Sequence, residues 1–360
     1  MPTTIHIGHH FFGAGNAGDD FMLAGFLSAL AGRGRKPGRG SSGFRHNVAL
    51  TCCVPYPMPP LARRFPEIAW RPYDEVSRRA GVDACDAWLG LGGSPFQNAV
   101  SPWFAEHLAT EAALCRAAGK PMYFLGVGGQ DEAAYEAEGL RTAAAQAEAI
   151  WTRDPATARA LAAIARPGKI RTAADLSHIF FEICPPPAAV SGRLTAVLNF
   201  DYAGWPDLEK ALAALAALPA VERVWLAQED RPLPGAERAL FGGLPAGERA
   251  RWRLQMSDMP GEPLRRVLAR WPSGEWLLAS RFHATVAAAW AGSRAVVVAT
   301  NDKLRGVAAE CGYPAFEIDD DPSTLAHVLE ASAAPERAAL QSRAEAARQA
   351  CAEFFAAIGL

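Results

Sequence analysis

The sequence lacks the features that mark disulfide-rich, zinc-binding or membrane-spanning chains. Its seven cysteines are dispersed, odd in number and without a C-x-x-C spacing, which is typical of reduced thiols in a cytosolic protein. No apolar run approaches the ~18 residues that cross a bilayer, and the N-terminal stretch MPTTIHIGHHFF has no basic start before an apolar segment. We therefore expect a cytoplasmic protein whose contact with membranes is at most peripheral.

An excess of charge of one sign is lacking as well. The 360 residues carry 36 basic and 38 acidic side chains, a formal net charge of −2, so no overall basic field favours nucleic acid. Half of the residues are hydrophobic and 21% are charged, which excludes wholesale disorder. A chain of this length is too long to fold around a single hydrophobic core, which favours two domains.

Short β-branched or aromatic runs alternate with alanine-rich helical stretches along the chain. This alternation predicts parallel sheets with helices on both faces, an α/β protein. Beyond a first strand around Ile5, strands are predicted at 48–51, 87–91, 121–125, 149–152, 170–173, 195–199, 223–227, 275–279, 295–299 and 315–318. The spacing of apolar residues predicts a helix over 22–30, and Asp154 followed by Pro155 predicts a capped helix start.

A domain break is predicted at residues 184–193, where CPPPAAVSGR carries three consecutive prolines. We expect one Rossmann-like domain over residues 1–186 and a second over 187–332. A last helix within 333–360 packs back on the first domain in this prediction. Two such domains facing one another across a cleft resemble the GT-B arrangement, with the ligand site in the crevice.

A glycine-rich loop follows the first strand. Gly13, Gly15 and Gly18 match the G-x-G-x-x-G of dinucleotide sites, but Asp19 and Asp20 occupy the helix start where a pyrophosphate would bind. The second strand, ending in Thr-Cys-Cys, also offers no acid for a ribose hydroxyl. We therefore expect the loop to serve a polar, uncharged ligand such as a sugar.

Further candidate residues stand where strands end and helices begin, the edge at which open α/β sheets bind ligands. Asn16 is expected to hydrogen-bond hydroxyl groups, and Asp19 to act as a general base, to cap its helix, or both. The remaining candidates are Gly93 and Ser94, Arg153, Lys303 in the loop after a strand, and the group Ser280, Arg281 and His283. In that group Ser280 is the predicted helix cap, with Arg281 and His283 in the first turn.

The segments GAGNAGDD, GLGGSPFQN, GVGG, TRD, ASRFHA and NDK, in this order, resemble the polysaccharide pyruvyl transferase family. Members of that family move a pyruvyl group from phosphoenolpyruvate to sugar hydroxyls, usually as a cyclic ketal, and release phosphate. The resemblance implies an acceptor that is a polysaccharide or lipid-linked glycan. It places the acceptor on the first domain and the donor on the second, with no metal and no organic cofactor. The sequence departs from the family at GGSPFQN and at the shortened TNDK loop, so the acceptor sugar stays open.

The resemblance, together with the chemistry of phosphoenolpyruvate, implies roles for the candidate residues. Arg153, Arg281 and Lys303 would neutralise the phosphate and carboxylate of phosphoenolpyruvate. His283 would protonate the methylene carbon, and Asp19 would accept the proton of the sugar hydroxyl. The rest of the predicted substrate-binding set is Asn16, Gly15, Gly18, Ser280, Gly93 and Ser94.

Plainer and rival interpretations stay open beside this one. Arg153 alternatively pairs with Asp154 or Asp175, and Lys303 is alternatively a surface residue. A GT-B glycosyltransferase with a nucleotide-sugar donor would use the same fold, with Gln228, Glu229 or Asp230 as the nucleoside clamp. A non-catalytic glycan-binding relative is a third reading. The basic loop at 33–46 is either solvated or in contact with an anionic acceptor. Ketal regiochemistry and oligomeric state are not determined.

Overall fold

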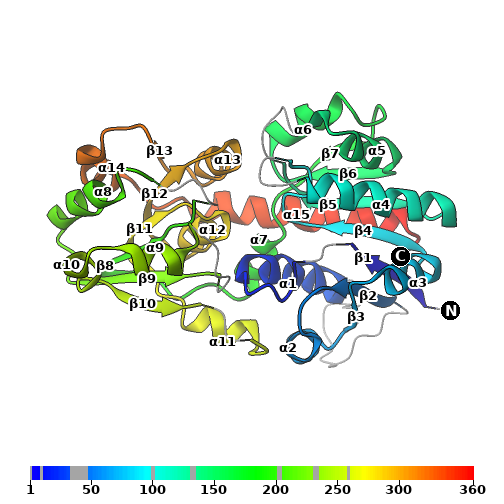
Figure 1. Cartoon of the computed structure of the whole chain (residues 1–360), viewed down its shortest axis with the longest axis horizontal. Helices are drawn as coiled ribbons and strands as arrows, with labels where there is room; N and C mark the ends of the chain where they lie inside the picture. The colour runs from blue at the N-terminus through cyan, green and yellow to red at the C-terminus, as the bar shows by residue number, and fades with distance from the viewer. Residues whose placement is uncertain are drawn as a thin grey trace. The chain divides into compact units, whose positions relative to one another are not determined.

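The computed structural model describes residues 2–8, 11–32, 48–98, 102–129, 135–200, 205–229, 235–257 and 260–360. It divides into two compact units, each of them an α/β structure (Figure 1). The first unit comprises Met1–Gly13, Asp19–Phe180 and Ser342–Leu360, and the second comprises Ala14–Gly18 and Phe181–Gln341. The basic loop at 33–46 and Asp230 lie outside the described residues. So do His9 and His10, which the sequence predicts to follow the first strand.

The first unit contains a seven-stranded sheet with the order β3-β2-β1-β4-β5-β6-β7, and its pairings are parallel. The strands are β1 (Thr3–Ile7), β2 (Val48–Val54), β3 (Ile68–Pro72), β4 (Ala87–Leu91), β5 (Met122–Val127), β6 (Ala149–Thr152) and β7 (Ile170–Thr172). The chain runs outward from β1 in one direction and from β4 in the other. The point between β1 and β4 is therefore a topological switch point, where open sheets of this kind bind ligands.

Helices cover both faces of this sheet, as the alternation predicts. They are α1 (Ala17–Gly32), α2 (Met58–Arg64), α3 (Glu75–Ala84), α4 (Trp103–Ala118), α5 (Glu138–Gln146), α6 (Pro155–Ala162), α7 (Ser177–Ile183) and α15 (Arg337–Ala357). Helix α15, drawn red in Figure 1, runs along the sheet from the C-terminal end of the chain. Its Phe354 meets Trp151 of β6 and Tyr123 of β5, and Phe355 meets Phe26 of α1 at 5.7 Å between ring centroids. The last helix thus closes the core of the first unit.

Between the sheet and helices α3 and α4 the first unit buries a carboxylate. Glu111 accepts hydrogen bonds from Trp88 Nε1 at 2.8 Å and from Arg78 Nε at 2.7 Å. Burial raises the pKa of the Glu111 carboxyl, and the Arg78 guanidinium opposes that rise. The strands beside it are buried on both faces, as in a sheet covered by helices on each side.

The second unit contains a six-stranded sheet with the order β10-β9-β8-β11-β12-β13, again with parallel pairings. Its strands are β8 (Val190–Val197), β9 (Glu222–Ala227), β10 (Arg253–Met256), β11 (Gly274–Ala279), β12 (Arg294–Ala299) and β13 (Ala315–Glu317). Its helices include α8 (Leu208–Ala214), α9 (Glu237–Gly243), α11 (Leu264–Ala269), α12 (Phe282–Ala291), α13 (Asp302–Cys311) and α14 (Leu325–Ala331). The switch point of this sheet lies between β8 and β11.

The sequence predicted eleven strands close to their observed positions and missed β3 and β10. Both missed strands lie at the edge of a sheet and carry exposed or polar residues, so the apolar pattern that marks a strand is weak there. The predicted break at 184–193 is too long, because β8 already begins at Val190. The capped start of α6 is confirmed: the Asp154 carboxylate accepts from the Thr157 N–H at 2.7 Å, and Pro155 follows.

The seven cysteines are free thiols, as expected. Burial raises the pKa of the Cys53 thiol, and that of the Cys85 thiol, to about 11. Such thiols stay protonated at neutral pH and are poor nucleophiles. Within the described residues, the structure contains no helix of sufficient length and hydrophobicity to cross a membrane.

Candidate functional site

In the second unit, Ser280 directly follows β11 at the switch point. Its hydroxyl accepts a hydrogen bond from the Asn199 N–H at 2.6 Å and donates one to the Asn199 carbonyl at 2.7 Å. The side chain therefore joins the ends of β8 and β11. The prediction that Ser280 caps the next helix is wrong, because both of these bonds go to Asn199 and the N-cap residue of α12 is Arg281.

Helix α12 begins at this point with no side-chain cap among the described residues. Its first intrahelical hydrogen bond runs from the Thr285 N–H to the Arg281 carbonyl at 3.1 Å. The amides of Phe282, His283 and Ala284 precede that bond and belong to the helix N-terminus, which carries partial positive charge. A helix start at the carboxyl end of a parallel strand is a favourable binding point for phosphate.

The Arg281 side chain is held by two buried carboxylates. Its Nε donates to Glu237 Oε1 at 2.6 Å, and its Nη2 donates to Glu237 Oε2 at 3.3 Å and to Glu229. Glu237 is fully buried and Glu229 nearly so. The guanidinium charge is thus offset within the second unit. Sequence reasoning missed Glu237, because a glutamate in the first turn of a helix usually faces solvent.

The ends of β9 and β10 present buried polar groups. Gln228 donates through Nε2 to Asn16 Oδ1 at 3.1 Å, and its Oε1 has no hydrogen-bond partner in the described part of the chain. Ser257 lies beside it, since its N–H donates to the Ala227 carbonyl at 2.9 Å, and the Ser257 hydroxyl is likewise unsatisfied among described residues. Unsatisfied buried polar atoms are uncommon, and they mark positions where a ligand or water completes the bonding.

The glycine-rich loop contributes Ala14–Gly18 to the second unit. Asn16 Oδ1 accepts from the Gly18 N–H at 3.1 Å as well as from Gln228. A Cβ atom on Gly18 would lie 2.1 Å from Nδ1 of the buried His283. Only glycine at position 18 allows this approach, so the structure brings the loop residues Asn16 and Gly18 together with Gln228 and His283. Gly15 has a φ of +86°, which favours glycine.

Two of the predicted residues of the second unit lie differently from their expected positions. Arg281 is the N-cap residue of α12, not a residue of its first turn. Lys303 lies in the first turn of α13, not in a loop, and is partly exposed. The Asn301 side chain caps that helix by accepting from the Leu304 N–H at 3.1 Å.

Arg153 belongs to the first unit and is almost completely buried. Its Nη1 donates to Asp175 Oδ2 at 2.8 Å and its Nη2 donates to Ser94 Oγ at 2.9 Å. A Cβ atom on Gly128 would lie 2.7 Å from Arg153 Nε. The arginine therefore ties together the loops that follow β4, β6 and β7, and it forms the ion pair with Asp175 that was the plainer interpretation.

The two aspartates at the start of α1 are buried in the first unit. Asp20 forms an ion pair with Arg64 in which both side chains are 3% exposed. Asp19 is 8% exposed and lies in the first turn of the helix. Gly93, after β4, has a φ of +70°, and its N–H donates to the sulfur of Met22 at 3.1 Å. These contacts fix the helix start against the neighbouring loop.

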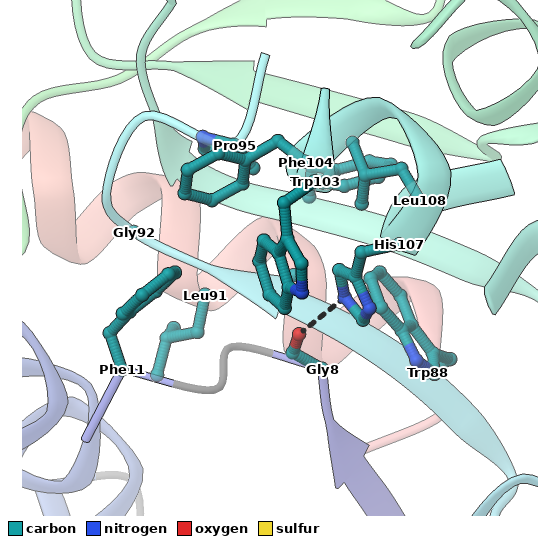
Figure 2. A pocket seen from close by; sticks show the side chains of 12 residues that line it. Gly8, Phe11, Trp88, Leu91, Gly92, Pro95, Trp103, Phe104, His107 and Leu108 are labelled. Carbon is teal, nitrogen blue, oxygen red and sulfur yellow. Dashed lines mark hydrogen bonds between the residues drawn. The ribbon is translucent and has the colours of Figure 1, made fainter. Parts of the chain in front are cut away.

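An aromatic cluster lines a small cavity at the switch point of the first unit (Figure 2). His107, from α4, stacks on Trp103 with 4.9 Å between ring centroids and 9° between ring planes. Its ring nitrogens lie 3.1 Å from the Tyr73 hydroxyl and 3.3 Å from the Gly8 carbonyl. The space open to a water-sized molecule is about 10 Å³, room for roughly one water. Sequence reasoning missed this cluster, whose signal is the aromatic pairs at HHFF and SPWF.

Among the described residues, no three His, Cys, Asp or Glu side chains lie together in a way that would hold a metal ion. No protein-family model matches the sequence, and no curated protein does either.

Solved structures of similar fold cover nearly the whole chain. Anabaena HepE in complex with UDP-glucose matches 99% of this chain and 100% of its own, with a TM-score of 0.64 and 10% identity. UDP-N-acetylglucosamine 2-epimerase from Rickettsia bellii matches 99% and 95%, with a TM-score of 0.63 and 11% identity. The S. aureus MnaA–UDP complex matches 98% and 95%, with a TM-score of 0.60 and 11% identity. The fold of this chain is GT-B-like.

These findings correct the resemblance to polysaccharide pyruvyl transferases, which is wrong. The similar structures are of UDP-sugar epimerases and of HepE bound to UDP or UDP-glucose, not of pyruvyl transferases. The prediction of pyruvyl transfer from phosphoenolpyruvate is therefore wrong. The roles predicted for Arg153, Arg281, Lys303 and His283 in binding and protonating that donor are withdrawn as well.

The glycine-rich and Thr-Arg-Asp segments led to the wrong family because in this chain they serve the fold. Gly92, Gly93 and Gly126 have φ values of +62°, +70° and +67°, so glycine follows β4 and interrupts β5 for conformational reasons. In the Thr-Arg-Asp segment, Asp154 caps α6 and Arg153 joins neighbouring loops. In this chain the strand-end turns are thus explained by backbone conformation and loop packing, and their order does not identify one chemistry.

Proposed function

We propose that this protein is a glycosyltransferase of GT-B type that uses a nucleotide sugar, with UDP as the nucleotide. The observation that carries the proposal is the start of α12 at the switch point of the second unit. There the helix N-terminus follows β11 directly, with the amides of Phe282, His283 and Ala284 preceding the first intrahelical bond. A diphosphate bound there would meet backbone N–H groups and a favourable helix dipole.

The polar groups at the ends of β9 and β10 suit the rest of such a donor. Gln228 Oε1 and the Ser257 hydroxyl are buried and unsatisfied among the described residues, so each has bonding capacity for a ligand's N–H or O–H groups. A nucleoside and a sugar ring both present such donors. The proposal is supported by the solved structures of similar fold, several of which hold UDP or a UDP-sugar.

Transfer of a glycosyl group needs a base for the acceptor hydroxyl and stabilisation of the departing diphosphate. The N-terminus of α12 supplies the second. His283, in the first turn of that helix, and Asp19, after the glycine loop, are the proposed catalytic side chains. In this scheme Asp19 accepts the proton of the acceptor hydroxyl as its oxygen bonds to the anomeric carbon, and His283 donates a proton to the leaving phosphate as the bond between that carbon and the phosphate breaks.

The proposal is tested first with ligands. Calorimetry should show binding of UDP and of UDP-glucose or UDP-N-acetylglucosamine, and no binding of phosphoenolpyruvate. Incubation of each UDP-sugar with an array of glycan acceptors should then release UDP and lengthen a glycan. Absence of UDP binding would overturn the proposal. Conversion of UDP-N-acetylglucosamine to its C2 epimer without release of UDP, followed by NMR, would replace transfer with epimerisation.

Replacement of the proposed catalytic histidine separates chemistry from binding. His283→Gln keeps a hydrogen-bonding amide of similar reach but loses the titratable ring, so turnover should fall about 10²–10⁴-fold while UDP affinity stays close to wild type. The matched control is His327→Gln, on the exposed side of α14 in the same unit, which should change neither quantity. Near wild-type turnover in His283→Gln would assign the proton chemistry to another group.

A further inference from the structure

The aromatic cluster of the first unit lies at the switch point of its sheet, the place where open α/β sheets generally bind ligands. Gly8 follows β1 and Gly92 follows β4, the two strands that flank the switch point, and both glycines line the small cavity there. Phe11 comes from the loop after β1, and Trp103 and Phe104 come from the first turn of α4 (Figure 2). Two segments far apart in the sequence thus place aromatic rings at one point.

The three rings contact one another and remain partly exposed. Phe11 lies 5.4 Å from Trp103 and 5.4 Å from Phe104 between ring centroids, and Trp103 lies 5.1 Å from Phe104. Each of them is intermediate in exposure, whereas the aromatic residues of the nearby core, such as Phe96 and Phe124, are completely buried. Aromatic side chains that keep part of their surface in water at a sheet edge are typical of a binding surface.

The central ring of the cluster is held in a fixed orientation. His107 covers one side of Trp103 in a near-parallel stack, and His107 is itself 6% exposed and held between the Tyr73 hydroxyl and the Gly8 carbonyl. Arg78 lies over the Tyr73 ring at 4.8 Å. A ring that is already ordered loses little conformational entropy on binding, so it is well suited to recognise a flat apolar face.

The size of the cavity decides where a ligand would lie. The space among the rings holds about one water molecule, far too little for a sugar ring. A ligand would therefore lie on the outer, exposed surface of the rings and not inside the cavity. The apolar C–H face of a pyranose ring has the size and shape to cover such a surface, and its outward hydroxyls stay hydrated. This geometry favours a saccharide over an acyl chain, which would need a deep apolar groove.

We propose that Phe11, Trp103 and Phe104 form a stacking platform for a sugar ring of the glycan acceptor. The inference rests on the proposed function for its need of an acceptor. To that function it adds the residues that bind the acceptor and the way in which they recognise it, by stacking against a sugar ring.

The test uses a glycan array with the full-length protein in the presence of UDP. The wild type should bind a subset of the glycans, and Trp103→Ala should bind the same glycans about tenfold more weakly or worse. Trp103→Phe should retain most of the binding, because it keeps an aromatic face. The matched control is Trp70→Ala, a partly exposed tryptophan on β3 of the same unit, which should bind as the wild type does.

Several outcomes would overturn the inference. It fails if the wild type binds no glycan, or if Trp103→Ala binds glycans as well as the wild type. Co-sedimentation of the wild type, but not of Trp103→Ala, with phosphatidylcholine–phosphatidylglycerol vesicles would assign the cluster to a membrane surface instead. Calorimetry of UDP with each variant distinguishes these failures from failure of the proposed function, because the platform variants should bind UDP normally if the donor site is intact.

Discussion

The absence of a side chain at Gly18 makes room for the imidazole ring of His283 in the second unit. An alanine Cβ there would lie 2.1 Å from His283 Nδ1 and 2.7 Å from its Cγ, so the imidazole must move. We expect Gly18→Ala to reduce turnover at least about tenfold by displacing the proposed catalytic ring. Because His283 is buried, moving its ring also costs stability, so the thermal midpoint should fall as well.

The control for this variant is Gly32→Ala at the other end of α1, where a Cβ would meet nothing within 4 Å. It should leave turnover unchanged. If Gly18→Ala is as active as the wild type, the position of His283 is not important for the reaction. The measurements are UDP release with a working acceptor and differential scanning fluorimetry.

His6 gives the first unit a defined dependence on pH. Burial, together with the nearby Arg71 and Arg78 guanidinium groups, lowers the pKa of His6 to about 4. In the unfolded chain this histidine titrates near its ordinary pKa of 6.5, so between pH 6.5 and 4 the unfolded state binds the extra proton. Stability is therefore present above pH 6.5 and is lost as the pH falls, by about 2 kcal/mol between pH 7 and pH 5.

Replacement of His6 by asparagine should remove this part of the acid sensitivity. His6→Asn keeps a polar group for Thr51 Oγ1, which lies 2.8 Å from His6 Nδ1, but it cannot take up the proton. The drop in thermal midpoint from pH 7 to pH 5 should be smaller in His6→Asn than in the wild type, while His327→Asn should show the wild-type drop. Equal drops in all three proteins would contradict the pKa assignment.

At the scale of elements, the cap of α6 joins a helix to a strand-end loop. The Asp154 carboxylate accepts from the Thr157 N–H at 2.7 Å and from the Thr157 hydroxyl at 2.8 Å, and that hydroxyl accepts from the Gly129 N–H at 2.8 Å. Asp154→Ala should cost about 1–2 kcal/mol, because it removes the cap and releases Thr157 from its orientation.

The α3 cap provides the comparison for that prediction. The Asp74 carboxylate accepts from the Ser77 N–H at 2.7 Å and lies at an exposed position. Asp74→Ala should therefore cost less than Asp154→Ala in thermal unfolding, and Asp154→Asn should recover most of the lost stability. Equal costs at the two caps would show that the link to Gly129 contributes nothing.

The elements were largely predictable and the site was only partly so, for different physical reasons. β4 and β6 match the sequence prediction at both ends, because strands buried on both faces leave an unbroken apolar run between polar turns. The ion pair of Arg153 with Asp175 was one of two open alternatives, and only the packing of three loops selects it. Glu237 was missed because its partner Arg281 is 44 residues away and the local pattern resembles a solvated helix start.

At the scale of the whole molecule, α15 brings the C-terminal end of the chain into the core of the first unit. Phe354 is fully buried and contacts Tyr123 at 5.5 Å and Trp151 at 6.2 Å between ring centroids. Phe354→Ala should cost about 3–5 kcal/mol, since it opens a cavity against two sheet strands. The control is Gln349→Ala on the exposed face of the same helix, which should cost less than about 0.5 kcal/mol.

Limited proteolysis of Phe354→Ala and Gln349→Ala shows which unit loses stability. In Phe354→Ala, cleavage should appear first within Asp19–Phe180, and the second unit should resist as it does in the wild type. Early cleavage confined to the second unit would contradict the assignment of α15 to the core of the first.

The position of α15 in the chain sets the order in which the two units are completed during synthesis. The first unit contains residues from both ends of the sequence, and the whole of Phe181–Gln341 is translated before Ser342–Leu360. At about 5–20 residues per second, roughly 10–40 s separate the emergence of β6 and its tryptophan from that of the helix that covers it. The second unit, apart from its short N-terminal loop, is continuous and can fold as it leaves the ribosome. The unit whose strands are synthesised first is therefore completed last, and until then Tyr123 and Trp151 lack the contacts that Phe354 supplies.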